Sequence, residues 1–336
     1  MRLKKKGKAY IFRRFFYACM LLLGLLGTFR AQAAPPIEIQ SEVLEQVIDG
    51  NTEFIFDASS MHTVQTIQAV TEWREPDGEP FSKGLDEGVM WLRFRLVNPT
   101  NQSEERALQF SNGHADRLTV WITDENSGTE KFEIGQDAPL QERPIKHFIP
   151  RVPIRVDAGA QKSVVLRIED EGTMSGSLQL AKLDILQSQE MSSHLVTGLM
   201  TGIFGLMGIY AFALFLWLRK PIFGWLSALA ICSLLQWMVF NWGEAGLLVP
   251  VESRAWLTNR LIIVFLSGSV FCTFLFYVEA CSLRVRFPRL SKLILWFAWF
   301  ELSNAFLVFV LPYIQSVRIL FFGAVGFLAL VCAVLY

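Results

Sequence analysis

The sequence is poor in cysteine, in histidine and, over its C-terminal part, in charge, and each scarcity excludes something. Its five cysteines are Cys19, Cys232, Cys272, Cys281 and Cys332, so residues 34–193 contain none. That segment forms no disulfide and needs a hydrophobic core of its own, which about 160 residues can supply. No cysteine spacing fits a zinc site.

Catalytic motifs are absent as well. The four histidines, His62, His114, His147 and His194, stand at unrelated points of the chain. We find no nucleotide-binding loop, no metal-ligand cluster and no nucleophile arrangement. The sequence therefore predicts no enzyme, no metal and no cofactor for this chain. The net charge of zero gives no indication of nucleic-acid binding.

The zero total is the sum of three unlike parts. Residues 1–33 carry eight Lys and Arg and no acid, residues 34–193 carry 27 Asp and Glu against 14 Lys and Arg, and residues 194–336 carry nine Lys and Arg against four Glu. In the first part a basic start leads into an apolar run from Phe15 to Phe29, and Ala31-Gln32-Ala33 follows. This is typical of a secretory signal peptide (1–33), with an uncleaved anchor as the alternative. A disulfide-free domain after such a signal indicates a bacterial periplasm.

Residues 50–186 show short runs of alternating apolar and polar residues, separated by turn-rich segments such as EPDGEP and DENSGT. Many short strands without a helical period predict an all-β, jelly-roll-like sandwich over 34–189. Pro150 and Pro153 mark their strand as an edge strand or a bulged one. The predicted strands are 53–57, 64–73, 89–98, 106–112, 118–124, 131–135, 149–156, 162–170 and 178–186.

An all-α transmembrane helix bundle is predicted for 190–336, because the apolar runs become long enough to cross a bilayer, which takes about 20 residues. The spans are 195–218, 222–242, 256–279, 293–311 and 317–336. If the sandwich is exported, the loops at 219–221 and 281–292 are cytoplasmic, and they hold six Lys and Arg. This distribution follows the positive-inside rule. Five crossings end inside, and the last span has no flanking Lys or Arg at that end, so we expect the chain to be cut short after its fifth span.

Two segments resemble a known family. The exported stretch GVMWLRFRLVNPT and the first span, GLMTGIFGLMGIYAFALFLWLRKP, are similar to bacterial seven-transmembrane receptors with diverse intracellular signalling modules. The resemblance covers about residues 40–336. It implies a jelly-roll sensory domain akin to carbohydrate-binding modules, seven spans, and a cytoplasmic effector such as a diguanylate cyclase or a histidine kinase.

Strand alternation divides the sandwich residues into two faces. Met90, Leu92, Phe94 and Leu96 are predicted to face the core, together with Leu118, Val120, Ile122, Val164, Leu166 and Ile168. An outer ligand-binding face would then hold Trp91, Arg93, Arg95, Trp121 and Arg167. Indole rings stack on sugars, and arginine binds hydroxyl, carboxylate or phosphate groups, so the ligand would be a carbohydrate or an acidic small molecule. The alternative is a solvated face, or tryptophans packed beneath a loop.

The spans contain a glycine row and several polar groups. The glycines Gly198, Gly202, Gly205 and Gly208 fall near one face of the first span, where another helix should contact them. Glu301 lies mid-span, one turn before Asn304, and must face the bundle interior. Arg260 and Asn241 are candidate partners, and the group is either a structural clamp or a switch.

The sequence thus favours a membrane receptor whose exported domain binds a small molecule or carbohydrate. Its partners would be the lipid bilayer and a cytoplasmic signalling effector, with no nucleic acid, and a homodimer is one arrangement that the sequence allows. The alternatives are a membrane-tethered binding module and a transporter with an exported accessory domain. The predicted location is the bacterial inner membrane, with the sensor domain in the periplasm.

Overall fold

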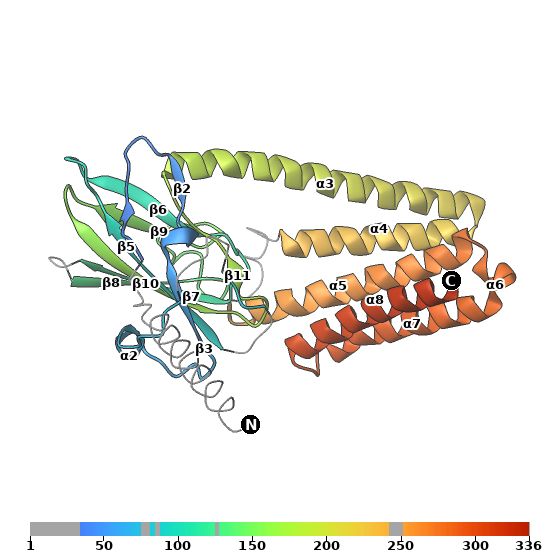
Figure 1. Ribbon diagram of the computed structural model, residues 1–336. Coiled ribbons are helices and arrows are strands. Elements are labelled where there is room, and N and C mark those ends of the chain that lie inside the picture. Colours follow the sequence, from blue (N-terminus) through green and yellow to red (C-terminus); the bar gives the residue numbers. More distant parts are fainter. Residues whose placement is uncertain (1–33, 75–80, 85–87, 125–127, 242–250, 336) are drawn as a thin grey trace, which may run out of the picture. The chain divides into compact units, whose positions relative to one another are not determined.

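The chain folds into a β-rich part followed by long helices (Figure 1). The computed structural model describes residues 34–74, 81–84, 88–124, 128–241 and 251–335. The predicted signal peptide, 1–33, lies outside the described residues. The strands are β1 (Ile37–Glu38), β2 (Glu45–Val47), β3 (Glu53–Asp57), β4 (Phe81–Ser82), β5 (Val89–Val97), β6 (Glu104–Phe110), β7 (Arg117–Asp124), β8 (Gly128–Ile134), β9 (Arg151–Val156), β10 (Gln161–Glu169), β11 (Ser175–Gly176) and β12 (Leu178–Ala181).

Two sheets form the sandwich, as predicted. One has the strand order β1-β5-β10-β7-β8, with β3 also pairing with β5, and the other has the order β2-β12-β6-β9. Among the described strands of these sheets, only β1 and β5 pair in parallel. β9 contains Pro153 and lies at the edge of its sheet, where the missing N–H of proline breaks no ladder hydrogen bond.

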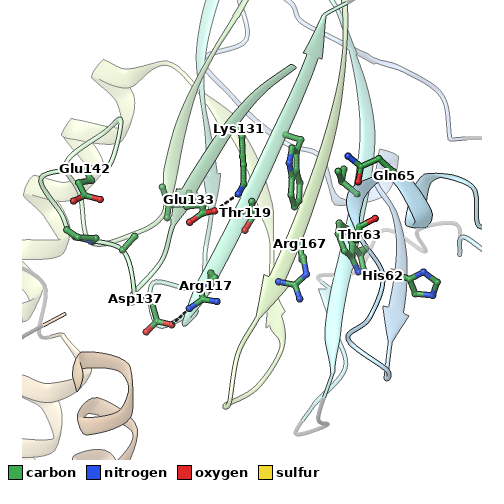
Figure 2. Close-up of a pocket in the computed structure, with 16 residues that line it drawn as sticks. His62, Thr63, Gln65, Arg117, Thr119, Lys131, Glu133, Asp137, Glu142 and Arg167 are labelled. Atoms are coloured by element: carbon green, nitrogen blue, oxygen red, sulfur yellow. Dashed lines mark hydrogen bonds and ion pairs between the residues drawn. The ribbon is translucent and has the colours of Figure 1, made fainter. Parts of the chain in front are cut away.

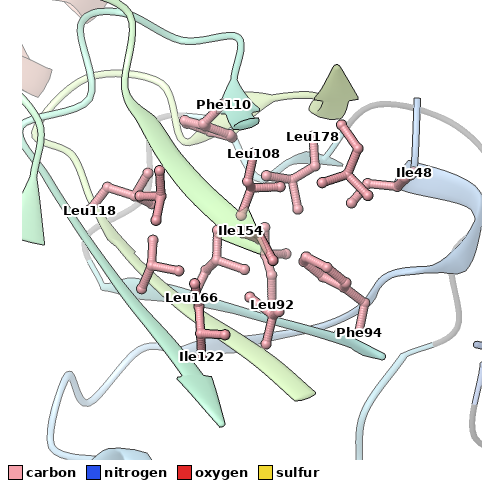
Figure 3. Packing of buried hydrophobic residues seen from close by; sticks show 14 of the residues in the cluster. Ile48, Leu92, Phe94, Leu108, Phe110, Leu118, Ile122, Ile154, Leu166 and Leu178 are labelled. Atoms are coloured by element: carbon pink, nitrogen blue, oxygen red, sulfur yellow. The ribbon is translucent and has the colours of Figure 1, made fainter. Parts of the chain in front are cut away.

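The core lies between the two sheets (Figure 3). Leu92 and Leu166, from β5 and β10, are fully buried with Ile154 of β9 and Leu178 of β12. All ten residues predicted for the inner face belong to this cluster. The two-residue period of the strands therefore identifies the core face correctly.

One predicted strand is wrong. Within 64–73 the structure has a short helix, α2 (Val64–Gln68), because Thr63 and Thr66 form a reciprocal capping box. The helix buries Ile67 against Trp91 and Trp73 on the outer face of the larger sheet. A short 3₁₀ turn, η1 (Asp49–Asn51), precedes β3.

The predicted strand 178–186 is too long, because β12 ends at Ala181 and α3 (Leu183–Leu218) begins two residues later. The segment 186–195 is therefore helical and continuous with the first span. Leu186 is buried against Ala107 and Ala181, and Arg151 of β9 is ion-paired with Glu190. The sandwich is thus joined to the first span by a continuous helix.

The remaining helices are α4 (Pro221–Phe240), α5 (Val251–Ala280), α6 (Leu283–Arg286), α7 (Pro288–Leu307) and α8 (Tyr313–Leu335). Neighbours along the chain pack together, α3 on α4, α4 on α5, α5 on α7 and α7 on α8. The five predicted spans fall on α3, α4, α5, α7 and α8. Among the described residues, three helices are long and apolar enough to cross a membrane, namely α3, α4 and the part of α5 from Ala255 to Ala280.

The core assignment predicts the effect of a truncation in β10. Leu166→Ala should lower the free energy of unfolding by about 2–5 kcal/mol, because it removes buried methyl groups and leaves a cavity. Urea unfolding of the chain in nonionic detergent, followed by circular dichroism, measures this. Ser163→Ala, at an exposed position of the same strand, should change the free energy by less than about 0.5 kcal/mol. Equal effects of the two substitutions would contradict the assignment.

Candidate functional site

A cavity of about 510 Å³ opens on the outer face of the larger sheet, and we call it the outer-face cavity (Figure 2). Its floor consists of side chains from β5, β7, β8 and β10, and its walls are residues 62–65 at the start of α2 and residues 137–142 after β8. The floor residues used below are Trp91, Arg117, Thr119, Trp121, Lys131 and Arg167. The volume is in the range of small-molecule sites.

Strand register explains why these side chains meet. Trp91 lies opposite Arg167 across the β5–β10 ladder, and Arg167 lies opposite Thr119 across the β10–β7 ladder. Trp121 lies opposite Lys131 across the β7–β8 ladder. Residues directly opposite on one face have neighbouring side chains, so the two rows form one continuous floor.

Three of the five residues predicted for the ligand-binding face line this cavity: Trp91, Trp121 and Arg167. The rings of Trp91 and Trp121 are stacked, with centroids 5.7 Å apart and planes inclined at 18°. The Arg167 guanidinium lies 5.7 Å from the Trp91 ring centroid. Trp91 is fully buried beneath α2, so it supports the floor and only the half-buried Trp121 presents ring surface to the cavity.

The other two predicted residues lie outside the cavity lining. Arg93 is ion-paired with Glu53, and its guanidinium lies 4.2 Å from the Trp73 ring centroid. Arg95 is exposed further along β5. All five residues belong to the outer face of the larger sheet, but only three of them line this cavity.

The cavity is charged, and its ion pairs are partly exposed. Arg117 lies 3.4 Å from Asp137 and 3.6 Å from Glu169, and Lys131 pairs with Glu133 (Figure 2). Partial burial, and secondly the Arg117 guanidinium, lower the pKa of Arg167 below its usual range. An anionic or hydroxyl-bearing ligand would relieve this crowding of guanidinium groups.

The sequence analysis missed the residues that β8 and the following loop supply, namely Lys131, Glu133 and Asp137, and those before α2. The alternating run at 131–135 placed Lys131 and Glu133 on one strand face, but the partner of that strand was unknown. Among the described residues, no group of three His, Cys, Asp or Glu side chains is placed to hold a metal ion.

The four polar residues predicted for the spans do not form one group. Glu301 is buried, and within the described residues neither of its oxygens has a hydrogen bond. Asn304 donates to the Ser316 carbonyl at 2.9 Å and so ties α7 to α8. Asn241 donates to the Trp237 carbonyl of its own helix.

The sequence suggested Arg260 as a candidate partner of Glu301, but the two residues are not paired in the structure. Its guanidinium binds Glu171, in the loop after β10, with an N–O distance of 3.0 Å. The pair joins the β-sandwich to α5.

Two of the four glycines in the row of the first span lie against α4. A β-carbon at Gly208 would lie 3.4 Å from Ile231 of α4, and one at Gly205 would lie 4.0 Å from Leu234. Ser227 of α4 donates to the Gly208 carbonyl. At Gly198 and Gly202 a β-carbon would meet no described heavy atom within 4 Å, so the predicted helix contact is present only at the later two glycines.

Two family models match the chain. The model described as 7TMR-DISM extracellular 2 matches residues 49–182, and the model described as 7TM diverse intracellular signalling matches residues 193–336. A comparison with curated proteins finds no significant match. The first match covers the part of the sandwich that holds the outer-face cavity, and the second covers the helices after the first turns of α3.

The environment of Glu301 predicts a size limit in α8. A β-carbon at Gly323 would overlap with the Glu301 carboxylate, so Gly323→Ala should destabilise the fold by about 1 kcal/mol, the low end of the range for overpacking, because the flexible end of Glu301 can shift. The loss of folded protein on heating in detergent measures this. Gly202→Ala is the matched control, since its added methyl group meets nothing. If both variants melt alike, Glu301 does not pack against Gly323.

Proposed function

Because the chain belongs to the family of seven-transmembrane receptors with diverse intracellular signalling modules, we propose that its sandwich binds a small molecule in the outer-face cavity and that the helix bundle passes the bound state to the cytoplasm. The observation that carries this proposal is the order of the two matches, an extracellular domain followed directly by the membrane domain. In the proposed arrangement the ligand site and the output lie on opposite sides of the bilayer.

The ligand we propose is a carbohydrate or an organic acid. Support comes from the cavity floor, where Trp121 offers ring surface and Arg117, Arg167 and Lys131 offer hydrogen-bond donors. Indole rings stack on the apolar face of sugars, and guanidinium groups bind carboxylates through two parallel hydrogen bonds. Thr119, at the centre of the floor, adds a hydroxyl group.

The proposed path to the membrane runs along β10. Arg167 in the cavity and Glu171 at the membrane side are separated by three residues of a strand and its following loop. Glu171 binds Arg260 of α5. A ligand that moves Arg167 or Glu169 is thus close enough to alter a contact with a span.

The remaining parts of the proposal concern location and output. We place the receptor in a bacterial inner membrane with the sandwich in the periplasm, after export by a signal peptide at 1–33. We assign no catalytic role to this chain and propose that a diguanylate cyclase or a histidine kinase, fused or separate, supplies the output. The basic segment around α6, with Arg284 and Arg286, is the cytoplasmic side in this arrangement.

The topology can be tested with cysteine labelling. Asn101→Cys, in the exposed turn between β5 and β6, should react with a membrane-impermeant maleimide in intact spheroplasts. The native Cys281, exposed beside α6, should react only after the membrane is permeabilised. Labelling of both cysteines before permeabilisation would refute the proposed orientation.

The ligand site can be tested by thermal-shift screening of the nanodisc-embedded chain against glycans and organic acids. For a ligand that stabilises the chain, Arg117→Gln and Trp121→Ala should each weaken binding about tenfold, a loss of about 1.4 kcal/mol. Arg155→Gln is the matched control, because Arg155 and Arg117 are both exposed and each lies 3.4 Å from an aspartate. A ligand indifferent to all three changes binds elsewhere. No stabilisation by either ligand class would overturn the proposed ligand.

A further inference from the structure

A second cavity, of about 620 Å³, lies where the sandwich meets the helices, and we call it the junction cavity. Its sandwich side includes Asp116, just before β7, and the segment from the end of β10 to Glu171. Its helix side includes residues from α5 and the start of α8. Neither the family matches nor the proposed function assigns a role to it.

Acidic groups are in excess around the junction cavity. Five carboxyl side chains and two guanidinium groups line it, and the carboxyl groups belong to Asp116, Asp137, Glu169, Asp170 and Glu171. A group of acids alone does not define a site, because carboxylates at a surface are usually solvated.

Asp116 supplies the evidence that points to a ligand. The residue is only 8% exposed, and its Oδ2 accepts a hydrogen bond from the Glu171 amide at 2.7 Å. Its Oδ1 is also buried, yet it has no hydrogen-bond partner among the described residues. A buried carboxylate oxygen without a donor is costly, and a ligand with N–H groups would satisfy it.

On the helix side of the cavity, the positively charged side chain of Arg260 already occupies an environment suited to an organic cation. The Arg260 guanidinium lies 4.9 Å from the Trp256 ring centroid and donates to Glu171 at 3.0 Å. An aromatic ring and a carboxylate around a cation are the elements of cation recognition in proteins. Tyr313 of α8 adds a second aromatic wall.

We propose that the junction cavity binds a small organic cation, an amine or a guanidinium compound, with Asp116 as its acceptor and Trp256 as its aromatic wall. The ligand competes with Arg260 for the same environment and weakens the contact between Glu171 and α5. Asp137 and Arg167 line both cavities, but the proposal does not depend on which ligand the outer-face cavity takes.

Other ligand classes fit the cavity less well. A divalent metal ion needs several ligands converging on one point, and no such group occurs among the described residues. An anion would meet more carboxyl groups than guanidinium groups. An amine needs one carboxylate, an aromatic surface and room for its carbon chain, and all three are present.

Protonation of the carboxyl groups opposes a cation. Burial raises the pKa of Asp116 to about 6 and that of Asp170 to about 7. Both acids are largely ionised only above these values, so cation binding strengthens as the pH rises through this window. The charged and titratable groups that surround Asp116 are Arg117, Asp137, Asp170, Glu171, Arg260 and Tyr313.

Titration calorimetry of the nanodisc-embedded chain with putrescine tests the proposal. We expect saturable binding at pH 8 that weakens at least tenfold at pH 5, because Asp116 is then mostly protonated while the diamine stays charged. Asp116→Asn should weaken binding at pH 8 at least tenfold and reduce the pH dependence to the part that Asp170 contributes. Asp157→Asn, the same change at the opposite end of β10, should stay within twofold of the parent.

Arg260→Gln distinguishes competition from damage to the fold. Because it removes the internal competitor and one positive charge, it should tighten putrescine binding several-fold, whereas disruption of the junction would weaken it. The proposal would be overturned if Arg260→Gln bound putrescine more weakly, or if Asp116→Asn and Asp157→Asn lost affinity equally. It would also be overturned if putrescine gave no saturable heat, or if MgCl2 gave the same heat.

Discussion

The two-residue period of β10 is the constraint on which the rest of the sandwich depends. Val164, Leu166 and Ile168 point into the core, so the intervening Val165, Arg167 and Glu169 must point outward. The same strand therefore stabilises the fold with one face and presents charge with the other. A register shift of one residue would bury the Arg167 guanidinium among aliphatic side chains, where burial of an unpaired charge is strongly destabilising. The core thus fixes the register that positions the outer-face cavity.

Charged side chains are tolerated where the sandwich meets the helices, because these side chains lie at the ends of the helices. Trp256 and Arg260 are near the start of the apolar part of α5, and Tyr313 is the first residue of α8. Aromatic and basic side chains are stable at the edge of a bilayer, where one end of the side chain contacts lipid and the other contacts water. A mid-span acid such as Glu301 has no such access and must pack inside the bundle, where Gly323 leaves room for it.

Sequence patterns predicted the parts that depend on local periodicity. Alternation identified the core of β5, β7 and β10, and apolar length identified the five long helices. Contacts between distant segments were not predictable. Nothing near Arg260 indicates that its partner is Glu171, 89 residues earlier. Around residues 64–73, only the capping pair of Thr63 and Thr66 distinguishes a capped helix from a strand. Trp91 was assigned to the correct face, but the helix that buries it could not be foreseen.

The strength of the ion pair between Glu171 and Arg260 indicates how the two cavities would be coupled to the helices. The side chain of Glu171 is 56% exposed, so its ion pair with Arg260 contributes at most about 1 kcal/mol. Coupling between a ligand site and a distant response usually needs about 1–3 kcal/mol. One exposed ion pair is therefore too weak, and several contacts must change together. Asp137 and Arg167 line both cavities, and Glu169 binds both Arg117 and Arg167. A ligand affects the bundle only if it binds the two arrangements of this network with different affinity.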